Sequence, residues 1–432
     1  MQIIEYPAQP EWQQLLERPR QDNASVEATV KKIMLDVKAE GDRAVDKYSL
    51  EFDQVSLKDR FVTEAEWHAA EAELAEPLKA AIRMAWKNIE RFHAKQRIQE
   101  EVMETMPGIR CWRKSVPIEK VGLYIPGGTA PLFSTVLMLA VPAVIAGCRE
   151  IQLCSPPGKE GKLHPAILYA AAVAGVRRIV KAGGAQAIAA MAYGTETISR
   201  VDKIFGPGNR YVTCAKQLLQ QEGVAIDMPA GPSELAVYAD ETANPDFVAA
   251  DLLSQCEHGP DSQVILVTGS KKLAEQVIQA IEQQLSVLPR KDIARKALQH
   301  SKAILVLDTD ASMELLNTYA PEHLILACRN AEDLVSAVKN AGSVFIGHFA
   351  PETAGDYASG TNHTLPTNGF ARAYSGVSVD SFIKKISFQQ ISEEGLAGIG
   401  ETLMEMARAE GLQAHAAAVE IRLKQMKKNS HA

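Results

Sequence analysis

The sequence of 432 residues lacks the patterns that mark secreted, membrane and nucleic-acid-binding proteins. Its N-terminus has no apolar segment behind a basic start, which argues against a secretory signal. The most apolar run, residues 132–148, contains Pro142 and is too short to span a membrane. With a net charge of -7 and no long basic run, a nucleic-acid partner is not expected. We therefore expect a soluble, cytoplasmic protein that acts on a small molecule and has no membrane partner.

Paired cysteines are also missing. None of the six cysteines forms a C-x-x-C pair, and most lie inside apolar stretches such as 144–148 and 151–154. This pattern is typical of reduced, buried thiols. A thiol nucleophile of the kind that aldehyde dehydrogenases use is not expected, because Cys111 and Cys148 have no neighbouring histidine or basic helix start.

The common nucleotide-binding sequences are absent as well. No G-x-G-x-x-G opens a helix after a strand, and there is no Walker A lysine loop. Glycine turns do follow predicted strands, at residues 126–128, 183–184 and 206–208. Such turns bind ligands at the carboxyl ends of parallel strands, but they also serve as plain structural turns. From these residues alone, both interpretations carry about equal weight.

The order of predicted elements indicates an α/β fold. Helical periodicity covers residues 25–52 and 64–96, and from Lys120 onward short apolar strands alternate with helices across glycine turns. This alternation predicts βαβ units around parallel sheets. The expected strands are 121–125, 151–155, 177–184, 201–209, 263–269, 302–308, 323–328 and 343–347. The expected helices among them begin near Ser134 or cover 164–176, 185–194, 211–220, 271–285, 311–319 and 331–340.

After Gly376 the pattern is helical again, over 393–409 and 413–428, with a break at Gly411. The predicted fold class is therefore α/β, with two incomplete Rossmann-like parallel-sheet domains, an N-terminal arm and a helical C-terminal segment.

Gln255 and His258 form the first candidate for a functional pair. They stand three residues apart at the end of a predicted helix that begins at Asn244 and stops at Gly259. They share one face of the last turn of this helix, where their polar side chains could bind a metal. The alternative is an ordinary surface helix end with a histidine near the free carbonyls. From these residues alone it is favoured over a metal site by about three to one, because glutamine is an uncommon zinc ligand.

Glu322 and His323 form the second candidate, directly before an apolar strand. A histidine titrates near neutrality and suits the removal of a hydroxyl proton, although a polar strand cap explains the pair slightly better by itself. The loop 355–363 and the segment from Glu410 to His415 also place polar groups beside glycines. An exposed turn and a partly buried core histidine are their structural explanations.

Together these segments resemble the histidinol dehydrogenase family, over nearly the whole chain. The matching stretches, in the family's order, are VGLYIPGGTAPLFSTVLML, GGAQAIAAMAYGTE, VDKIFGPGNRYV, AIDMPAGPSE, DLLSQCEHGPDSQVIL, PEHL, AGDYASGTNHTLPT and AHAAAVEIR. Ordered matches of this length are far more specific than any single short motif, so the functional interpretations gain weight.

The resemblance implies roles for individual residues by position. The implied zinc ligands are Gln255, His258, Asp356 and His415. The implied acid-base pair is Glu322 and His323, and the implied NAD contacts are Tyr124, Gln186 and Asn209. Contacts with the substrate, L-histidinol, are implied for Ser233, Gln255, His258, His323, Asp356, Glu410 and His415, with His363 beside that site.

The resemblance also implies an architecture and a reaction. One discontinuous Rossmann-like domain comprises residues 22–120 and 235–375 and surrounds a second, NAD-binding domain at 121–234. An arm precedes them at 1–21, and a helical segment at 376–432 reaches the partner's active site in a homodimer. The implied reaction is the last step of histidine biosynthesis. L-histidinol is oxidised to L-histidinal and then to L-histidine, using NAD twice and one zinc ion per subunit.

Two alternatives stand beside this interpretation. One is a family paralogue that oxidises another small polar alcohol with the same zinc and Glu-His machinery, against which Glu410 and His415 argue. The other is a catalytically silent nucleotide- or metal-binding protein on the same scaffold. The production of NADH from L-histidinol, with and without a chelator, separates all three.

Overall fold

The computed structural model describes residues 1–19, 24–97, 100–127, 131–229 and 231–429. Gly128 of the first predicted glycine turn, and the predicted boundary between residues 21 and 22, lie outside these residues. The chain forms two compact units. The first comprises Met1–Gln96 with Ile118–Phe382, and the second comprises Arg97–Pro117 with Ile383–Ala432.

The first unit contains a six-stranded sheet in which every neighbouring pair is parallel. Its strand order is β1 (Gln2–Glu5), β11 (Lys302–Leu305), β10 (Gln263–Thr268), β9 (Glu234–Ala239), β12 (His323–Ala327) and β13 (Ser343–Ile346). Since side chains alternate across a strand, each face has its own apolar core.

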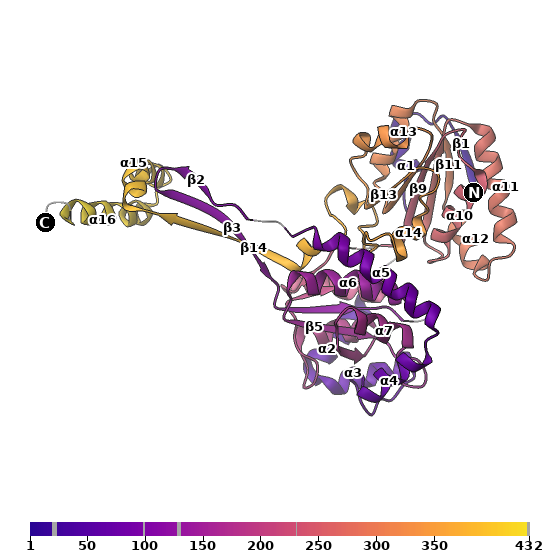
Figure 1. Cartoon of the computed structure of the whole chain (residues 1–432), viewed down its shortest axis with the longest axis horizontal. Coiled ribbons are helices and arrows are strands. Elements are labelled where there is room, and N and C mark those ends of the chain that lie inside the picture. The colour runs from indigo at the N-terminus through magenta and orange to yellow at the C-terminus, as the bar shows by residue number, and fades with distance from the viewer. Residues whose placement is uncertain (20–23, 98–99, 128–130, 230, 430–432) are drawn as a thin grey trace. The chain divides into compact units, whose positions relative to one another are not determined.

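Helices cover both faces of this sheet (Figure 1). One core joins the sheet to α10 (Pro245–Cys256), α11 (Lys271–Leu285) and α12 (Lys291–Gln299). The other joins it to α1 (Trp12–Leu15) and α13 (Thr309–Tyr319). A further short helix, α14 (Glu352–Tyr357), follows β13.

The four strands predicted from residue 263 onward are confirmed as β10 to β13. Two strands of the same sheet were not predicted. The N-terminal arm begins as β1, and β9 occupies an interior place with all six of its residues buried. The predicted helix over 331–340 is a 3-10 helix, Ala331–Ala337, because the chain becomes extended at Val338.

A five-stranded parallel sheet lies in the same unit, as the strand-helix alternation predicted. Its order is β6 (Arg178–Lys181), β5 (Glu150–Ser155), β4 (Lys120–Tyr124), β7 (Lys203–Phe205) and β8 (Ala225–Ile226). One apolar core contains α4 (Glu64–Glu73), α5 (Glu76–Ala94), α6 (Phe133–Ala146) and α7 (Pro165–Val173). The other contains α2 (Ala24–Glu40), α3 (Asp42–Tyr48), α8 (Gly184–Tyr193) and α9 (Arg210–Gln221).

The second unit is an antiparallel sheet with two helices. Its strands, in the order β14 (Ile383–Ile391), β3 (Ile109–Pro117) and β2 (Met103–Met106), are followed by α15 (Glu393–Ala409) and α16 (Gln413–Asn429). Both helices and the break at Gly411, whose φ is 75°, confirm the prediction. The strand β14 was not predicted, because its apolar residues are spaced neither every second position nor in a helical pattern.

Short helical segments complete the described chain: Gln9–Glu11, Ser49–Asp53, Phe370–Arg372 and Val379–Phe382. None of the described helices is both long and apolar enough to cross a membrane.

The turn between β7 and α9 requires glycine at position 206. Gly206 has a φ of 122°, and a Cβ atom there would lie 2.1 Å from the backbone oxygen of Tyr124 in the adjacent strand β4. Its N–H donates to Asp227 Oδ2 at 2.8 Å, and its carbonyl accepts from Lys216 Nζ at 2.8 Å. The turn therefore has little freedom to move away from Tyr124.

We predict that Gly206→Ala lowers the free energy of unfolding by about 2 kcal/mol or more, since left-handed backbone strain and a backbone clash act together. Gly223→Ala is the matched control. Gly223 also has a positive φ, 87°, but no atom lies within 4 Å of the added Cβ, so a loss of only about 1 kcal/mol is expected. Equal losses in urea-unfolding experiments on the two variants would contradict this account of the turn.

Candidate active site

The predicted acid-base pair lies at the entrance of β12, as the sequence indicated. Glu322 directly precedes the strand and His323 is its first residue, and both are buried. Both are held by the backbone of Glu234 at the start of β9. The Glu234 N–H donates to Glu322 Oε2 at 2.9 Å, and His323 Nδ1 lies 3.3 Å from the Glu234 carbonyl oxygen.

Burial determines the protonation of this pair. Desolvation lowers the pKa of His323 to about 3, so the imidazole is neutral near pH 7. The tautomer that donates from Nδ1 to Glu234 leaves the lone pair of Nε2 free. Desolvation raises the pKa of Glu322 well above its ordinary value.

A cluster of possible metal ligands lies beside His323. Among the described residues, His258, Glu352 and Asp356 each offer one ligand atom, and these atoms lie within 4.8 Å of one another. His323 Nε2 is 3.9 Å from Glu352 Oε1 and 3.8 Å from Asp356 Oδ1. Imidazole nitrogen and carboxylate oxygen are ordinary ligands of zinc.

Two further observations fit a cation at this cluster. The side-chain oxygen of Gln255 faces Glu352 Oε1 at 3.1 Å, and either a cation or a reversal of the amide relieves this contact between two acceptors. Desolvation, followed by the charge of Asp356, raises the pKa of Glu352 to about 8. Desolvation raises the pKa of Asp356 to about 6. A bound cation would offset the cost of ionising both.

The local sequence accounts for the placement of these ligands. Asn244 caps α10 by accepting from the Asp246 N–H at 2.8 Å, and the helix ends at Cys256, so Gln255 lies in its last turn and His258 just beyond. This confirms the predicted start of the helix, but the helix ends before Gly259, so His258 lies beyond the last turn that it was predicted to share with Gln255. Glu352 and Asp356 lie one turn apart in α14 and therefore share a face.

Glu352 was not predicted as a site residue. Its position four residues before Asp356 is the signal that could have identified it, and Ser254 Oγ, which donates to Glu352 Oε2 at 2.9 Å, ties it to α10. Of the four predicted zinc ligands, the first unit brings together Gln255, His258 and Asp356. His415 belongs to the second unit, in the first turn of α16, and the predicted substrate contact Glu410 caps α15 there.

The three predicted NAD contacts follow the carboxyl ends of strands in the five-stranded sheet. Tyr124 ends β4, and its hydroxyl accepts from the Gly184 N–H at 3.1 Å. Gln186 lies in the first turn of α8 and Asn209 caps α9. Along the chain, β5 and β6 lie on one side of β4, whereas β7 and β8 lie on its other side. Ligands bind at such a switch point in open α/β sheets.

Gln186 is the member of this set that points to a ligand. It is 1% exposed, and neither its amide nitrogen nor its amide oxygen has a hydrogen-bond partner within the described part of the chain. Buried amides are rarely left unsatisfied, so these atoms fit a polar group that a bound molecule supplies. Asn209 already has a structural task, since its Oδ1 accepts from the Tyr211 and Val212 N–H groups at 3.0 and 3.1 Å.

A cavity of about 1460 Å³ connects several of these positions. Its lining includes Asn209, Ser233 and His258, together with Arg18 of the N-terminal arm. The cavity thus brings a predicted NAD contact, a predicted substrate contact and a possible metal ligand to one space.

His363 Nε2 lies 3.4 Å from Thr135 Oγ1, and burial lowers the pKa of His363 to about 4.

Comparisons with known proteins identify the family of this chain. The family model of histidinol dehydrogenase matches residues 16–423. The chain is 59% identical to a histidinol dehydrogenase of Bacteroides thetaiotaomicron, over 99% of this chain and all of that protein. It is 50% identical to that of Escherichia coli K12, over 96% of each. The crystal structure of histidinol dehydrogenase from Elizabethkingia anophelis superposes with a TM-score of 0.97 at 54% identity, covering 99% of both chains. The chain therefore belongs to the histidinol dehydrogenase family.

Proposed function

We propose that this chain oxidises L-histidinol through L-histidinal to L-histidine, using NAD and one zinc ion per subunit. The observation that carries the proposal is the approach of His323 Nε2 to within 4 Å of the carboxylates of Glu352 and Asp356. A neutral imidazole thereby lies beside residues that could hold a metal, an arrangement suited to removing the proton of an alcohol bound there. The family relationship supports the choice of substrate.

His323 takes the hydroxyl proton in the first oxidation. Its Nδ1 is directed at the Glu234 carbonyl, so the proton goes to Nε2. The nearest carboxylate oxygens, 3.8 and 3.9 Å from Nε2, favour the positive charge that the ring then gains. NAD, when bound by Tyr124, Gln186 and Asn209, supplies the acceptor for the hydride.

Glu322 serves the second oxidation by activating the water that attacks the aldehyde, and the resulting hydrate gives its hydride to a second NAD. The Glu234 N–H fixes Glu322 Oε2, and the raised pKa makes the ionised carboxylate a stronger base than an exposed one. Gln255, His258, Asp356 and the partner's His415 would hold zinc, which would supply Lewis acidity and orient the substrate. We add Glu352 to the groups beside the metal, because its Oε1 lies within the same ligand cluster.

We predict that removal of zinc abolishes NADH production from L-histidinol with little loss of fold. The apolar cores of the first unit consist of hydrophobic side chains and include none of the proposed zinc ligands, so a chelator should leave the circular dichroism spectrum and the cooperative thermal transition intact. Added zinc should restore activity. Full turnover by protein that elemental analysis shows to be metal-free would exclude the proposed role of zinc.

We predict different effects for the two members of the acid-base pair. His323→Asn should slow the oxidation of L-histidinol by ~10²-fold or more, as expected for the loss of a general base. Glu322→Gln should slow the oxidation of L-histidinal more than that of L-histidinol. His68→Asn, on the exposed side of α4, is the control and should match the wild type. Equal losses on both substrates for Glu322→Gln would contradict the division of labour.

We further propose that Glu410 and His415 complete the active site of the partner subunit in a homodimer. Two inactive variants, His415→Ala and His323→Ala, test this by subunit exchange. In a mixed dimer one site carries both substitutions and the other carries neither. We therefore predict that activity returns, up to half of the wild-type level per mixed dimer. If mass spectrometry shows exchange and no activity returns, each site is built within one chain.

A further inference from the structure

Glu234 contacts both members of the acid-base pair through its backbone. Its N–H donates to Glu322 Oε2 at 2.9 Å, and its carbonyl oxygen lies 3.3 Å from His323 Nδ1. A shift of the first residue of β9 would therefore move the carboxylate of one and change the ring orientation of the other. The backbone of Glu234 must be held in place for the pair to keep its geometry.

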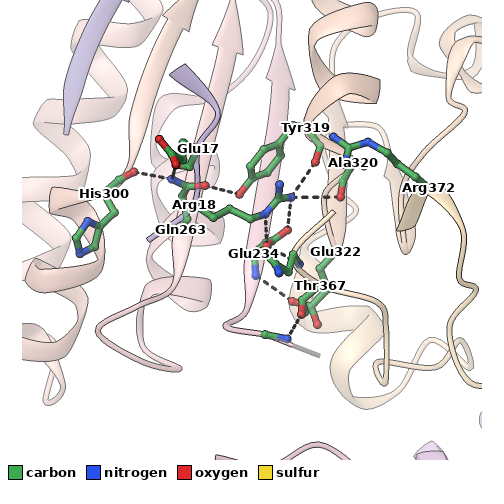
Figure 2. A network of polar contacts seen from close by, with 12 residues as sticks. Glu17, Arg18, Glu234, Gln263, His300, Tyr319, Ala320, Glu322, Thr367 and Arg372 are labelled. Carbon is green, nitrogen blue, oxygen red and sulfur yellow. Dashed lines mark hydrogen bonds and ion pairs between the residues drawn. The ribbon is translucent and has the colours of Figure 1, made fainter. Parts of the chain in front are cut away.

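The side chain of Glu234 is held by the N-terminal arm. It is 2% exposed, and Arg18 contacts it at two points, with Nε 2.5 Å from Oε1 and Nη2 2.8 Å from Oε2. The Asn368 N–H donates to the same Oε1 at 2.7 Å. Figure 2 shows Arg18 reaching Glu234, with Glu322 on the far side of Glu234. A paired guanidinium is the contact that makes a buried carboxylate tolerable.

Arg18 also contacts the segment that leads into β12. Its Nη2 donates to the Tyr319 carbonyl at 2.8 Å, and its guanidinium lies 4.2 Å from the centre of the Tyr319 ring. The next residue, Ala320, has a φ of 53°, a left-handed conformation that alanine rarely adopts. One side chain thus fixes both the start of β9 and the approach to Glu322.

Hydrogen bonds and apolar packing hold the N-terminal arm against the sheet, so Arg18 has a defined position. Gln263 Nε2 donates to the Glu17 carbonyl at 3.2 Å, and the Lys302 ammonium group donates to the Leu15 carbonyl. Trp12 is buried against the sheet. These contacts surround Arg18 without touching Glu322 or His323.

We propose that Arg18 and Glu234 are positioning residues for the Glu322–His323 pair, with the arm acting on the reaction through the backbone of Glu234. This inference rests on the proposed function, because it assumes that Glu322 and His323 carry out the proton transfers. In this proposal neither Arg18 nor the Glu234 side chain touches the reacting atoms.

The test measures kcat and KM for L-histidinol and L-histidinal in Arg18→Ala. Misplacement of both groups should lower kcat on each substrate about 10-fold or more, with a smaller change in KM. Added guanidinium, well below denaturing concentrations, should recover part of kcat, since Arg18 borders the cavity. Urea at the same concentration is neutral and of similar shape, and should not.

Three further variants separate positioning from general loss of stability. Arg18→Lys keeps the charge but loses the two-point contact, so an intermediate kcat is expected, and this variant decides the matter if Arg18→Ala does not fold. Glu234→Gln should lower kcat in the same direction without guanidinium rescue. Gln9→Ala removes an exposed contact of the arm with Glu314, 2.7 Å long, and should leave kcat unchanged.

The outcomes distinguish this inference from the proposed function. If the wild type does not oxidise L-histidinol, the proposed function fails. If the wild type does so while Arg18→Ala and Arg18→Lys keep its kcat, only the positioning role fails. A loss of kcat that follows the fall in thermal stability, and that guanidinium does not reverse, also overturns it.

Discussion

Leu235 of β9 stands opposite His323 of β12 in a parallel register, and the geometry of the candidate site depends on this pairing. Because the two strands begin side by side, the peptide groups of Glu234 face the side chains of Glu322 and His323. A shift of one residue in this register would turn His323 toward the opposite face of the sheet. The core on each face of the sheet prevents such a shift, since it would expose apolar side chains on both strands.

The same pairing brings the buried carboxyl groups of Glu234 and Glu322 together at the amino ends of β9 and β12, and Glu352 of α14 lies beside His323. Glu234, Glu322 and Glu352 are each less than 10% exposed, and isolated carboxylates cost much free energy at such depth. Different partners offset this cost for different carboxyl groups. Glu234 has a permanent cation in Arg18, whereas Glu352 and Asp356 have His258 and a space suited to a metal. The candidate site thus carries a local instability that the surrounding cores offset.

Local patterns in the sequence predicted elements whose signals are local. The capped helix α10, the strand β12 and the break at Gly411 follow from neighbouring residues alone. The strand β9 was missed because it begins with a glutamate and follows a proline-glycine segment. Glu352 was missed because α14 is only six residues long, too short to show helical periodicity. The contact of Arg18 with Glu234 joins residues 216 positions apart, and no local pattern carries that information.

The pairing of β1 with β11 also has a consequence for how the molecule is made. Residues 2–5 leave the ribosome long before their partners, residues 302–305, which are synthesised some three hundred positions later. The arm therefore spends most of translation without its place in the sheet, and contacts of such long sequence separation form slowly. Arg18 likewise precedes Tyr319 by some three hundred residues. The candidate site is thus completed late in cotranslational folding, and a domain fused to the N-terminus would have to leave this last docking step free.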